Sequence, residues 1–542
     1  MDQGFLRYCA HCSAPKTLQL NITGWQPLDW SSLRQDKMLR IQITHNGKSG
    51  TMDADPSKNL AQNLFVRGFI RHAPLCSGLG TCGQCAALFH GDPPVPSSKD
   101  MAFFTPEELA RGLRLGCSHY PQEGQSLELT QGEESARFEW AGRENPVCLG
   151  IDMGTTSLKW GFLHPEGRIS LGQTVNPQMG AGPDIMSRLS FAREDSDNYK
   201  LLSRLLTREV QSILDLGPVP EKRVCVSGNP AMLYFLLGRD ISGLSVSPYF
   251  LEYVGGVWED IGRKPVKAFV PSLWSPFVGA DISAGLSWIL EEIRPAYPFL
   301  LADFGTNGEL VLALSPERYL ATSVALGPAL EGIGLRWGSP YREGVASRFV
   351  LGSRGIEPGE SWHTGRISGS GYISLLGHLI RLRLISAQGH FTYESSSPIV
   401  RKIGENVKNG RLYLDRNLYM DGQDIEEILK VKAAFTLGLS FLCSRGGVLP
   451  DELRAIYIAG ALGEHSNLID LETLGFFPPG SSHKSRVVGN TSLKGAILLA
   501  GDNDKIQENI GLARFVGSVN LGFSQDYISR QFARHMLFKY PR

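Results

Sequence analysis

The middle of the chain carries two apolar runs, and each ends in a glycine-containing polar turn before a second apolar run begins. Val147–Ile151 leads into the turn Asp152–Ser157, and Leu300–Ala302 leads into the turn Asp303–Glu309. Apolar runs of this length on both sides of a tight turn are typical of strand–turn–strand units. The offset from Asp152 to Asp303 is 151 residues. Such an internal repeat predicts two similar subdomains.

The repeated turns have the chemistry of phosphate-binding loops. Glycine lets the backbone come close to phosphate oxygens, and neighbouring N–H and threonine hydroxyl groups donate to those oxygens. Asp152 and Asp303 are the expected catalytic residues, because a carboxylate can hold Mg²⁺ through water or orient a water for attack on the γ-phosphate. A single Asp-x-Gly hairpin is common, so the prediction depends on the second copy. The expected ATP contacts are Gly154, Thr155, Thr156, Ser157, Gly305, Thr306, Asn307 and Gly308.

Two further glycine-containing segments fit the same nucleotide. The apolar strand 455–458 runs into the small residues 459–463, which would let an adenosine lie against the backbone. Another glycine turn precedes an apolar helix that begins near residue 371. In isolation, each segment fits a plain β–α turn equally well. The expected nucleotide contacts here are Gly369, Ser370, Gly371, Gly460 and Gly463.

A second chemistry lies near the N-terminus, where three cysteines share a glycine-rich loop. Cys76, Cys82 and Cys85 form a C-x5-C-x2-C run, and Cys117 follows at a distance. Four thiolates suffice for a [2Fe–2S] cluster, and the loop glycines permit the positive φ angles that such a loop needs. The alternatives are a pair of disulfides or a zinc knuckle. Zinc sites usually pair two short knuckles, whereas here the fourth cysteine stands alone.

The residues around this loop alternate as the strands and helices of a small domain. We predict a strand over Leu39–Ile43, a hairpin turn at Asn46-Gly47, and helices near 59–70 and 105–112. Strands are expected at 86–89 and 126–130. Residues 38–132 resemble the β-grasp [2Fe–2S] ferredoxins, with the five-residue first gap of the adrenodoxin type. Farther along, Asp424–Glu427 predicts a capping-box helix start, and Gly446-Gly447 predicts its end.

Composition narrows the function classes. The 54 basic and 54 acidic residues balance, which argues against a dedicated nucleic-acid binder. No apolar run has the length of a membrane span and no signal peptide is evident, so we expect a cytoplasmic protein without a membrane partner. In that compartment, nine cysteines are more often ligands or thiols than disulfides. Cys148, Cys225 and Cys443 are expected in the core.

The expected organisation is a multidomain α/β and α+β chain. Residues 1–37, with the unexplained pair Cys9 and Cys12, are predicted to be an extension without stable order, and Met38 is a candidate translation start. The ferredoxin-like domain occupies 38–132 and a polar linker 133–146. Two RNase-H-like lobes follow at 147–299 and 300–542.

The three nucleotide turns together resemble the ASKHA superfamily, in which two RNase-H-like lobes close on ATP, as in actin-like ATPases and sugar kinases. A ferredoxin domain in front of an ASKHA domain resembles, more narrowly, the ATP-dependent reductive activators of corrinoid proteins. The segments that carry this resemblance are 176–178, 184–188, 227–232, 277–281, 303–309, 327–332, 369–371 and 459–463.

The resemblance implies a function. Such an activator passes one electron from a [2Fe–2S] cluster to the Co(II) of a corrinoid protein in a methyltransferase system and regenerates Co(I). It implies ATP and Mg²⁺ as further requirements, and an electron donor protein or reductase as a second partner. Relatives also commonly form homodimers. The transfer is uphill, and each ~59 mV corresponds to a factor of ten for one electron.

The resemblance has two departures, and other functions remain open. Larger relatives carry a middle domain, whereas here only the linker 131–145 separates the two halves. Asn307-Gly308-Glu309 also replaces the simpler form of the first turn. The alternatives are an activator of another low-potential metalloenzyme, an ASKHA kinase with a fused ferredoxin domain, and a plain electron carrier with a degenerate nucleotide fold.

Overall fold

The structure is a computed structural model that describes residues 38–45, 47–70, 76, 78, 80, 82–130, 137–142, 144–352, 355–359, 362–392, 397–415, 418–460, 466–519 and 525–541. The predicted extension 1–37, with Cys9 and Cys12, lies outside the described residues, and so does Gly463. Within the described part of the chain, no helix combines the length and the apolar content that a membrane span requires.

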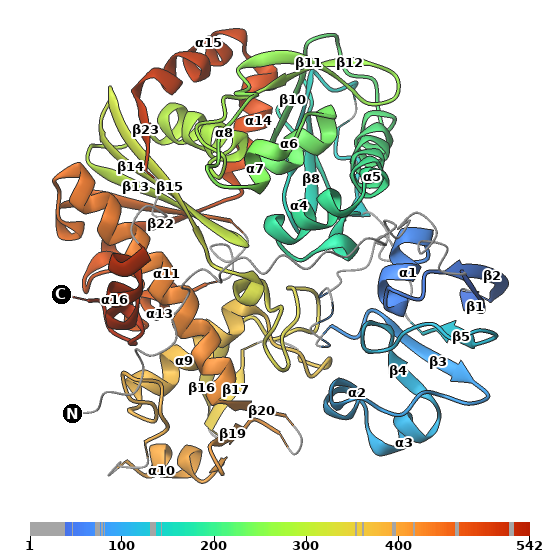
Figure 1. Cartoon of the computed structure of the whole chain (residues 1–542). Coiled ribbons are helices and arrows are strands. Elements are labelled where there is room, and N and C mark those ends of the chain that lie inside the picture. The colour runs from blue at the N-terminus through green and yellow to red at the C-terminus, as the bar shows by residue number, and fades with distance from the viewer. Residues whose placement is uncertain are drawn as a thin grey trace, which may run out of the picture.

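The N-terminal part forms a five-stranded sheet in the order β2-β1-β5-β3-β4 (Figure 1). β1 and β2 form the predicted hairpin around Gly47, and β1 pairs in parallel with β5. The helices begin at polar caps: Asn59 caps α1 and Thr105 caps α3, each in a capping box. The elements are β1 (Leu39–His45), β2 (Lys48–Ala54), α1 (Leu60–Arg67), β3 (Ala86–His90), α2 (Ser98–Phe103), α3 (Pro106–Ala110), β4 (Leu113–Leu115) and β5 (Ser126–Leu129).

A seven-stranded sheet follows, in the order β11-β12-β10-β7-β8-β9-β6. The segment predicted as a linker contributes to it, because Arg137–Phe138 pairs with β9 at the sheet edge. Phe138 stacks near Trp160, which explains why this polar segment is held on the sheet. The strands are β6 (Arg137–Phe138), β7 (Cys148–Met153), β8 (Ser157–Leu163), β9 (Ile169–Val175), β10 (Val224–Gly228), β11 (Val257–Ile261) and β12 (Val266–Val270). Its helices are α4 (Ile185–Glu194), α5 (Ser196–Leu214), α6 (Pro230–Leu237), α7 (Ser242–Ser245) and α8 (Ala280–Trp288).

The third large sheet has six strands in the order β22-β21-β13-β14-β15-β23. Its strands are β13 (Phe299–Phe304), β14 (Asn307–Ser315), β15 (Arg318–Ala325), β21 (Ala455–Ala459), β22 (Ser485–Gly489) and β23 (Val516–Ser518). The helices of this half are α9 (Gly369–Arg381), α10 (Pro398–Gly404), α11 (Gly422–Gly446), α13 (Leu468–Thr473), α14 (Thr491–Gly501), α15 (Asn503–Leu512) and α16 (Gln525–His535). Two small sheets combine β16 (Phe349–Gly352) with β17 (Gly355–Pro358), and β18 (Val407–Lys408) with β19 (Arg411–Tyr413) and β20 (Tyr419–Asp421).

The two large sheets repeat one topology, as the repeated turns predict. In the first sheet, β7, β8 and β9 form an antiparallel meander, with β10 and then β12 added in parallel beside β7. In the second sheet, β13, β14 and β15 form the same meander, with β21 and then β22 added in parallel. The turns β7–β8 and β13–β14 are therefore equivalent positions in the two halves.

The predicted boundary at residue 300 does not divide the chain in space. Helix α14 comes from the second half of the sequence, yet it lies beside α8 and β10 of the first sheet (Figure 1). Cys148 on β7 donates its thiol to the Ile497 carbonyl at 3.6 Å, and a Cβ on Gly150 would lie 2.6 Å from the Ile497 nitrogen. The predicted boundary is wrong here because β7 needs an apolar partner on this face, and α14 provides it. Cys148, Cys225 and Cys443 are buried, as expected.

One predicted helix start is also corrected. Helix α11 begins at Gly422, and its N-cap is Asp421, whose side chain accepts from the Gln423 and Asp424 N–H groups. Asp424 is the third residue of that capping box rather than its first. The predicted end is confirmed, since Gly447 closes the helix in the left-handed conformation.

Candidate functional site

The first predicted aspartate lies at the end of β7 and is fixed by side chains from the far end of the sequence. Asn490 donates its Nδ2 to Asp152 Oδ2 at 2.7 Å, and Ser492 donates its hydroxyl to Asp152 Oδ1 at 2.7 Å. Asn490 is also the N-cap of α14, with its Oδ1 accepting from the Leu493 N–H. The helix start that packs on the first sheet therefore also orients its carboxylate.

Three further carboxylates lie close enough to Asp152 to alter one another's protonation. Asp303 ends β13, and removal from water raises its pKa to about 7, an effect that Asp152 increases and Lys159 opposes. The pKa of Asp281, in the first turn of α8, is raised to about 7 by the same loss of water and by Asp152. Glu309, directly opposite Asp303 on β14, has its pKa raised well above the usual range by burial and by Asp281 and Asp303. Sequence reasoning assigned roles to Asp152 and Asp303 and missed Asp281 and Glu309.

The first turn is held from behind by polar side chains. The Arg188 guanidinium donates to the Thr155 carbonyl at 2.6 Å and to the Gly182 carbonyl at 2.9 Å. Asn176 Nδ2 donates to the Gly154 carbonyl at 2.8 Å, and Asn229 Nδ2 donates to the Thr155 hydroxyl at 3.3 Å. The segments 176–178, 184–188 and 227–232 thus converge on one turn. Ser157 follows as the first residue of β8.

The second turn is equivalent, and one carboxylate joins the two turns. Thr306 donates its hydroxyl to Glu331 Oε1 at 2.8 Å. Thr156, from the first turn, donates to the other oxygen of the same side chain, Glu331 Oε2. Gly305 N–H donates to the Asn307 carbonyl at 3.0 Å and closes the turn, and a Cβ on Gly308 would lie 2.7 Å from Leu326. Glu331 was noticed only as part of a glycine turn, because nothing local to it shows that both loops come to it.

The remaining predicted contacts lie near these turns. Gly460 follows β21 with a φ of 85°, and a Cβ there would lie 2.5 Å from Asp303 Oδ1. Gly369, Ser370 and Gly371 are buried in the first turn of α9. A Cβ on Gly369 would lie 1.9 Å from the Leu330 carbonyl. These glycines therefore allow close packing under the turn that carries Glu331, whereas their contact with a nucleotide stays a prediction.

The structure brings the four predicted cysteines together in two pairs. β3 pairs with β4 so that Ala86 lies opposite Leu115, and this register places Cys85 beside Cys117. A hydrogen bond with Cys117 raises the pKa of the Cys85 thiol, and the same bond lowers the pKa of Cys117. A hydrogen bond with Cys76 likewise raises the pKa of Cys82.

The cysteine loop has the local geometry that a sulfur-liganded group requires. The Cys76 N–H points at Cys82 Sγ at 3.3 Å, and the Gln84 N–H points at the same sulfur at 3.5 Å. Gly83 has a φ of 70°, and a Cβ there would lie 2.3 Å from the Phe103 ring. The seven cysteines that the structure describes form no disulfide. The disulfide alternative therefore fails for the four loop cysteines.

The cysteine loop packs directly against the nucleotide half of the molecule. Cys76 is 2% exposed and forms one buried apolar cluster with Met179 and Ile333. Met179 begins a short helical turn, Met179–Ala181, and Ile333 lies two residues after Glu331. Two other contacts hold the N-terminal sheet in place: the Phe65 ring is 6.3 Å from Phe191, and the Arg366 guanidinium lies 5.2 Å from the Phe103 ring centre.

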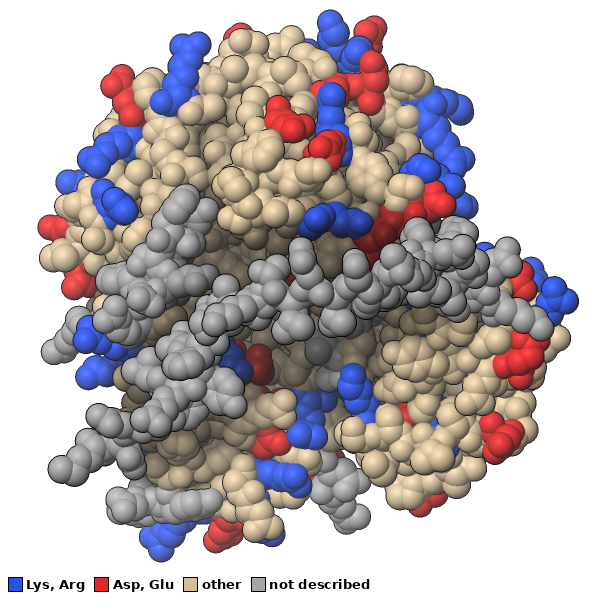
Figure 2. Space-filling model, viewed as in Figure 1, with Lys and Arg blue, Asp and Glu red and all other residues tan. Residues whose placement is uncertain are grey.

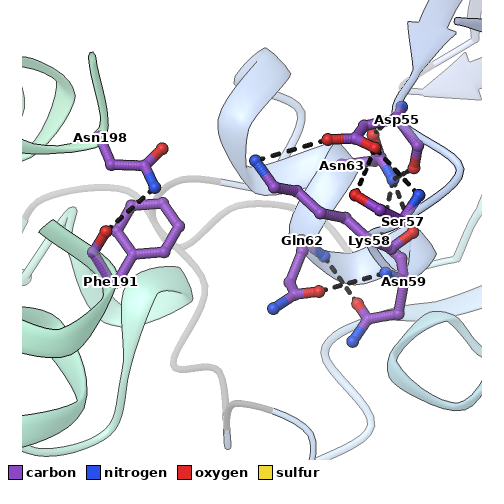
Figure 3. Close-up of polar contacts among 8 residues, drawn as sticks. All are labelled: Asp55, Ser57, Lys58, Asn59, Gln62, Asn63, Phe191 and Asn198. Atoms are coloured by element: carbon purple, nitrogen blue, oxygen red, sulfur yellow. Dashed lines mark hydrogen bonds and ion pairs between the residues drawn. The ribbon is translucent and has the colours of Figure 1, made fainter. Parts of the chain in front are cut away.

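The local structure on each side of that junction is itself rigid (Figure 3). On one side Asn63 donates to the carbonyls of Asp55, Lys58 and Asn59, which fixes the start of α1. On the other side Asn198 donates to the Phe191 carbonyl at 3.0 Å and joins α4 to α5. The side chains of Phe65 and Phe191 thus meet between two well-anchored helix ends.

Among the described residues, no three His, Cys, Asp or Glu side chains converge on a single point as the ligands of one metal ion do. This fits an Mg²⁺ ion that arrives with phosphate oxygens and waters and takes only one or two protein carboxylates. It also fits cysteines arranged two by two, because each iron of a [2Fe–2S] cluster takes two protein ligands. A zinc site with three or four cysteines is not formed by these residues.

Two family descriptions match this arrangement. The "RACo middle region" matches residues 147–289, and the "C-terminal domain of RACo the ASKHA domain" matches residues 298–541, which together make up more than two thirds of the chain. The chain belongs to the RACo family. The middle region occupies the residues predicted to form the first ASKHA lobe, so the expectation that a middle domain is missing is wrong.

Curated relatives and a solved structure agree with the family. The corrinoid activation enzyme RamQ of Eubacterium limosum is 25% identical over 398 residues, which are 66% of this chain and 64% of RamQ. The match thus spans less than two thirds of RamQ. The Co(II) methylated amine-specific corrinoid protein reductase of Methanosarcina barkeri is 25% identical over 406 residues, 69% of this chain and 73% of that protein. The solved reductive activator for corrinoid, iron-sulfur protein has a TM-score of 0.63 and 19% identity over 93% of this chain and 99% of its own, and it shows the shared fold.

Proposed function

We propose that this protein uses ATP to reduce the cobalt of a corrinoid protein in a methyltransferase system. The corrinoid is the substrate: Co(II) accepts one electron and becomes Co(I). An electron donor protein or reductase supplies that electron by way of the cysteine loop, and ATP is hydrolysed to ADP and phosphate in the same cycle. The names of the two curated relatives support a corrinoid protein as the partner.

The observation that carries the proposal is the direct contact between the two predicted functional centres. Cys76 packs on Met179 and Ile333, and these residues adjoin the groups that hold the two phosphate turns. A kinase with an unrelated fused domain has no need for such a contact. A protein that drives electron transfer with ATP does need one, because the two events must share a conformational change.

The four cysteines fit a [2Fe–2S] cluster of the β-grasp ferredoxin kind. They lie in two neighbouring pairs, Cys76 with Cys82 and Cys85 with Cys117. When bound, such a cluster supplies one-electron chemistry at low potential. The chain's own part is to present four sulfurs, direct two backbone N–H groups at Cys82, and keep water from Cys76 and Cys85, which are each 2% exposed.

The two turns fit the phosphates of ATP. Backbone N–H groups at Gly154 and Gly305 and the hydroxyls of Thr155, Thr156 and Thr306 are the donors. Asp152 and Asp303 approach from opposite sheets, and we assign to them the roles of holding Mg²⁺ and orienting the attacking water. The two sheets repeat one topology, so their closure on a shared ligand is a natural two-state motion.

The test mixes the reduced, cluster-loaded protein with a Co(II) corrinoid protein and follows the Co(I) absorbance. With MgATP we expect Co(I) to form, and without nucleotide we expect little. Cys82→Ser should lose the cluster spectrum and the reduction. Asp303→Ala should keep the spectrum and lose the ATP requirement's benefit, so that Co(I) stays at the level seen without nucleotide. Equal reduction with and without ATP would contradict the proposal.

A further inference from the structure

Glu331 is the one side chain in the described structure for which hydrogen bonds to both phosphate turns are seen. Its Oε1 accepts from Thr306 at 2.8 Å, and its Oε2 accepts from Thr156. We propose that this carboxylate holds the place of a nucleotide phosphate between the two turns, and that ATP displaces it and thereby releases the cysteine loop. This inference rests on the proposed function and adds the residue that couples its two halves.

The competition between Glu331 and ATP follows from the chemistry of the hydroxyl groups. A threonine hydroxyl carries a single proton and can donate it to only one acceptor at a time. Thr156 and Thr306 now donate to the carboxylate, so donation to a phosphate oxygen requires that these hydrogen bonds break. A carboxylate and a phosphate of like charge also repel each other strongly in a part-buried site. Nucleotide binding and the Glu331 bridge therefore exclude each other.

A short path leads from Glu331 to the cysteine loop. Ile333, two residues on, is 4% exposed and packs in one cluster with Cys76. The turn between them is tightly packed: a Cβ on Gly332 would lie 2.3 Å from the Ser339 carbonyl, and one on Gly369 would lie 1.9 Å from the Leu330 carbonyl. A close-packed turn shifts as a unit rather than deforming locally. Displacement of Glu331 therefore moves Ile333 away from Cys76.

A second path starts from the first turn and ends at the same cysteine. Arg188 donates to the Thr155 carbonyl at 2.6 Å and contacts Met179 Sδ at 3.2 Å. Met179 is fully buried and belongs to the cluster that contains Cys76. Both phosphate turns thus reach Cys76 through one intermediate apolar residue each, so a change in either turn reaches the cysteine loop.

The consequence is a protein whose cysteine loop is covered until ATP arrives. With Met179 and Ile333 against it, Cys76 is inaccessible to a protein partner. The contacts that hold the rest of the N-terminal sheet are few aromatic ones, between Phe65 and Phe191 and between Phe103 and Arg366. Loss of the Cys76 contact would leave these to hold the sheet, which favours its release toward the corrinoid.

The first experiment measures the affinity for a non-hydrolysable MgATP analogue by calorimetry, using the full-length, cluster-loaded protein. Glu331→Gln removes the charge and can accept from only one threonine, and we expect about tenfold tighter binding. Glu343→Gln is the matched control, since Glu343 is exposed and lies on the same segment; it should bind as the wild type does. Unchanged or weaker binding by Glu331→Gln would overturn the inference. Absence of binding by the wild type would instead contradict the proposed function.

The second experiment measures how fast a ferrous-iron chelator removes iron from the reduced protein. In the wild type, we expect the analogue to accelerate iron loss. Glu331→Gln should lose iron rapidly without nucleotide, and so should Ile333→Ala, which removes only the packing on Cys76 and should leave nucleotide affinity unchanged. Equal rates in the wild type with and without nucleotide and in Ile333→Ala would overturn the coupling even if Glu331→Gln failed to fold.

Discussion

The buried Arg188 offers the sharpest test of how the first phosphate turn is positioned. Its side chain is 0% exposed and donates to the carbonyls of Thr155 and Gly182 at 2.6 and 2.9 Å. Burial lowers the pKa of Arg188 to about 9, while Asp184 and Glu331 oppose that shift, so the guanidinium stays charged at neutral pH. Arg188→Met keeps much of the apolar volume and removes every donor.

The size of the effect follows from the two carbonyls. A buried acceptor left without a partner costs roughly 1–3 kcal/mol, and loss of the buried charge recovers part of that cost. We therefore expect the free energy of unfolding to fall by about 2–4 kcal/mol. The Thr155 carbonyl lies within the turn itself, so affinity for MgATP should also fall by about tenfold, equivalent to ~1.4 kcal/mol.

Urea denaturation and nucleotide calorimetry measure the two effects of Arg188→Met separately. Arg193→Met is the control, because Arg193 is exposed on the same helix, α4, and we expect it to change the free energy of unfolding by less than about 0.5 kcal/mol. A stable Arg188→Met variant with wild-type nucleotide affinity would refute the reasoning that this arginine holds the turn.

Three further predictions concern other parts of the chain. Cys85→Ser should lose the visible cluster spectrum and keep nucleotide binding by calorimetry; an intact spectrum would contradict the ligand assignment. Gly460→Ala should weaken MgATP binding more than tenfold, because its Cβ would meet Asp303 Oδ1 at 2.5 Å from a positive φ. Burial lowers the pKa of Lys432 to about 7, so the unfolded chain binds more protons above that pH and stability should rise from pH 7 to 10. In urea denaturation Lys432→Met should flatten this rise, and parallel pH profiles would exclude the effect.

Much of the fold follows from local patterns. The apolar runs before Asp152 and Asp303 gave the central strands, because buried strands need an unbroken apolar stretch. Asn59 and Thr105 mark helix starts through capping boxes that involve only a few neighbouring residues. The four cysteines are recognisable because the required residue type is rare and the spacing is short. Each of these signals is contained in a few consecutive residues.

The parts that sequence reasoning missed depend on distant segments. Asn490 and Ser492 reach Asp152 only because α14 crosses to the first sheet. Glu331 gains its role because two turns 150 residues apart converge on it, from Thr156 to Thr306. Asp281 lies in the first turn of an ordinary apolar helix, α8, and its pKa is raised by charges from both sheets. No local pattern reports such convergence.

Surface charge gives little guidance to the partners. On the face shown in Figure 2, basic and acidic side chains are interspersed rather than gathered by sign. This agrees with the equal totals of 54 basic and 54 acidic residues. Recognition of a corrinoid protein on this face would therefore depend on shape and apolar contact more than on long-range attraction.

The central claim is that ATP drives an electron uphill from the cysteine loop to cobalt. The most direct measurement poises the protein and a Co(II) corrinoid protein at a fixed donor potential and records the fraction of Co(I) at steady state, with MgATP and with MgADP. The account predicts that MgATP raises the Co(I) fraction above the value that the donor potential alone sets, and that MgADP does not. The same Co(I) fraction with both nucleotides would contradict it.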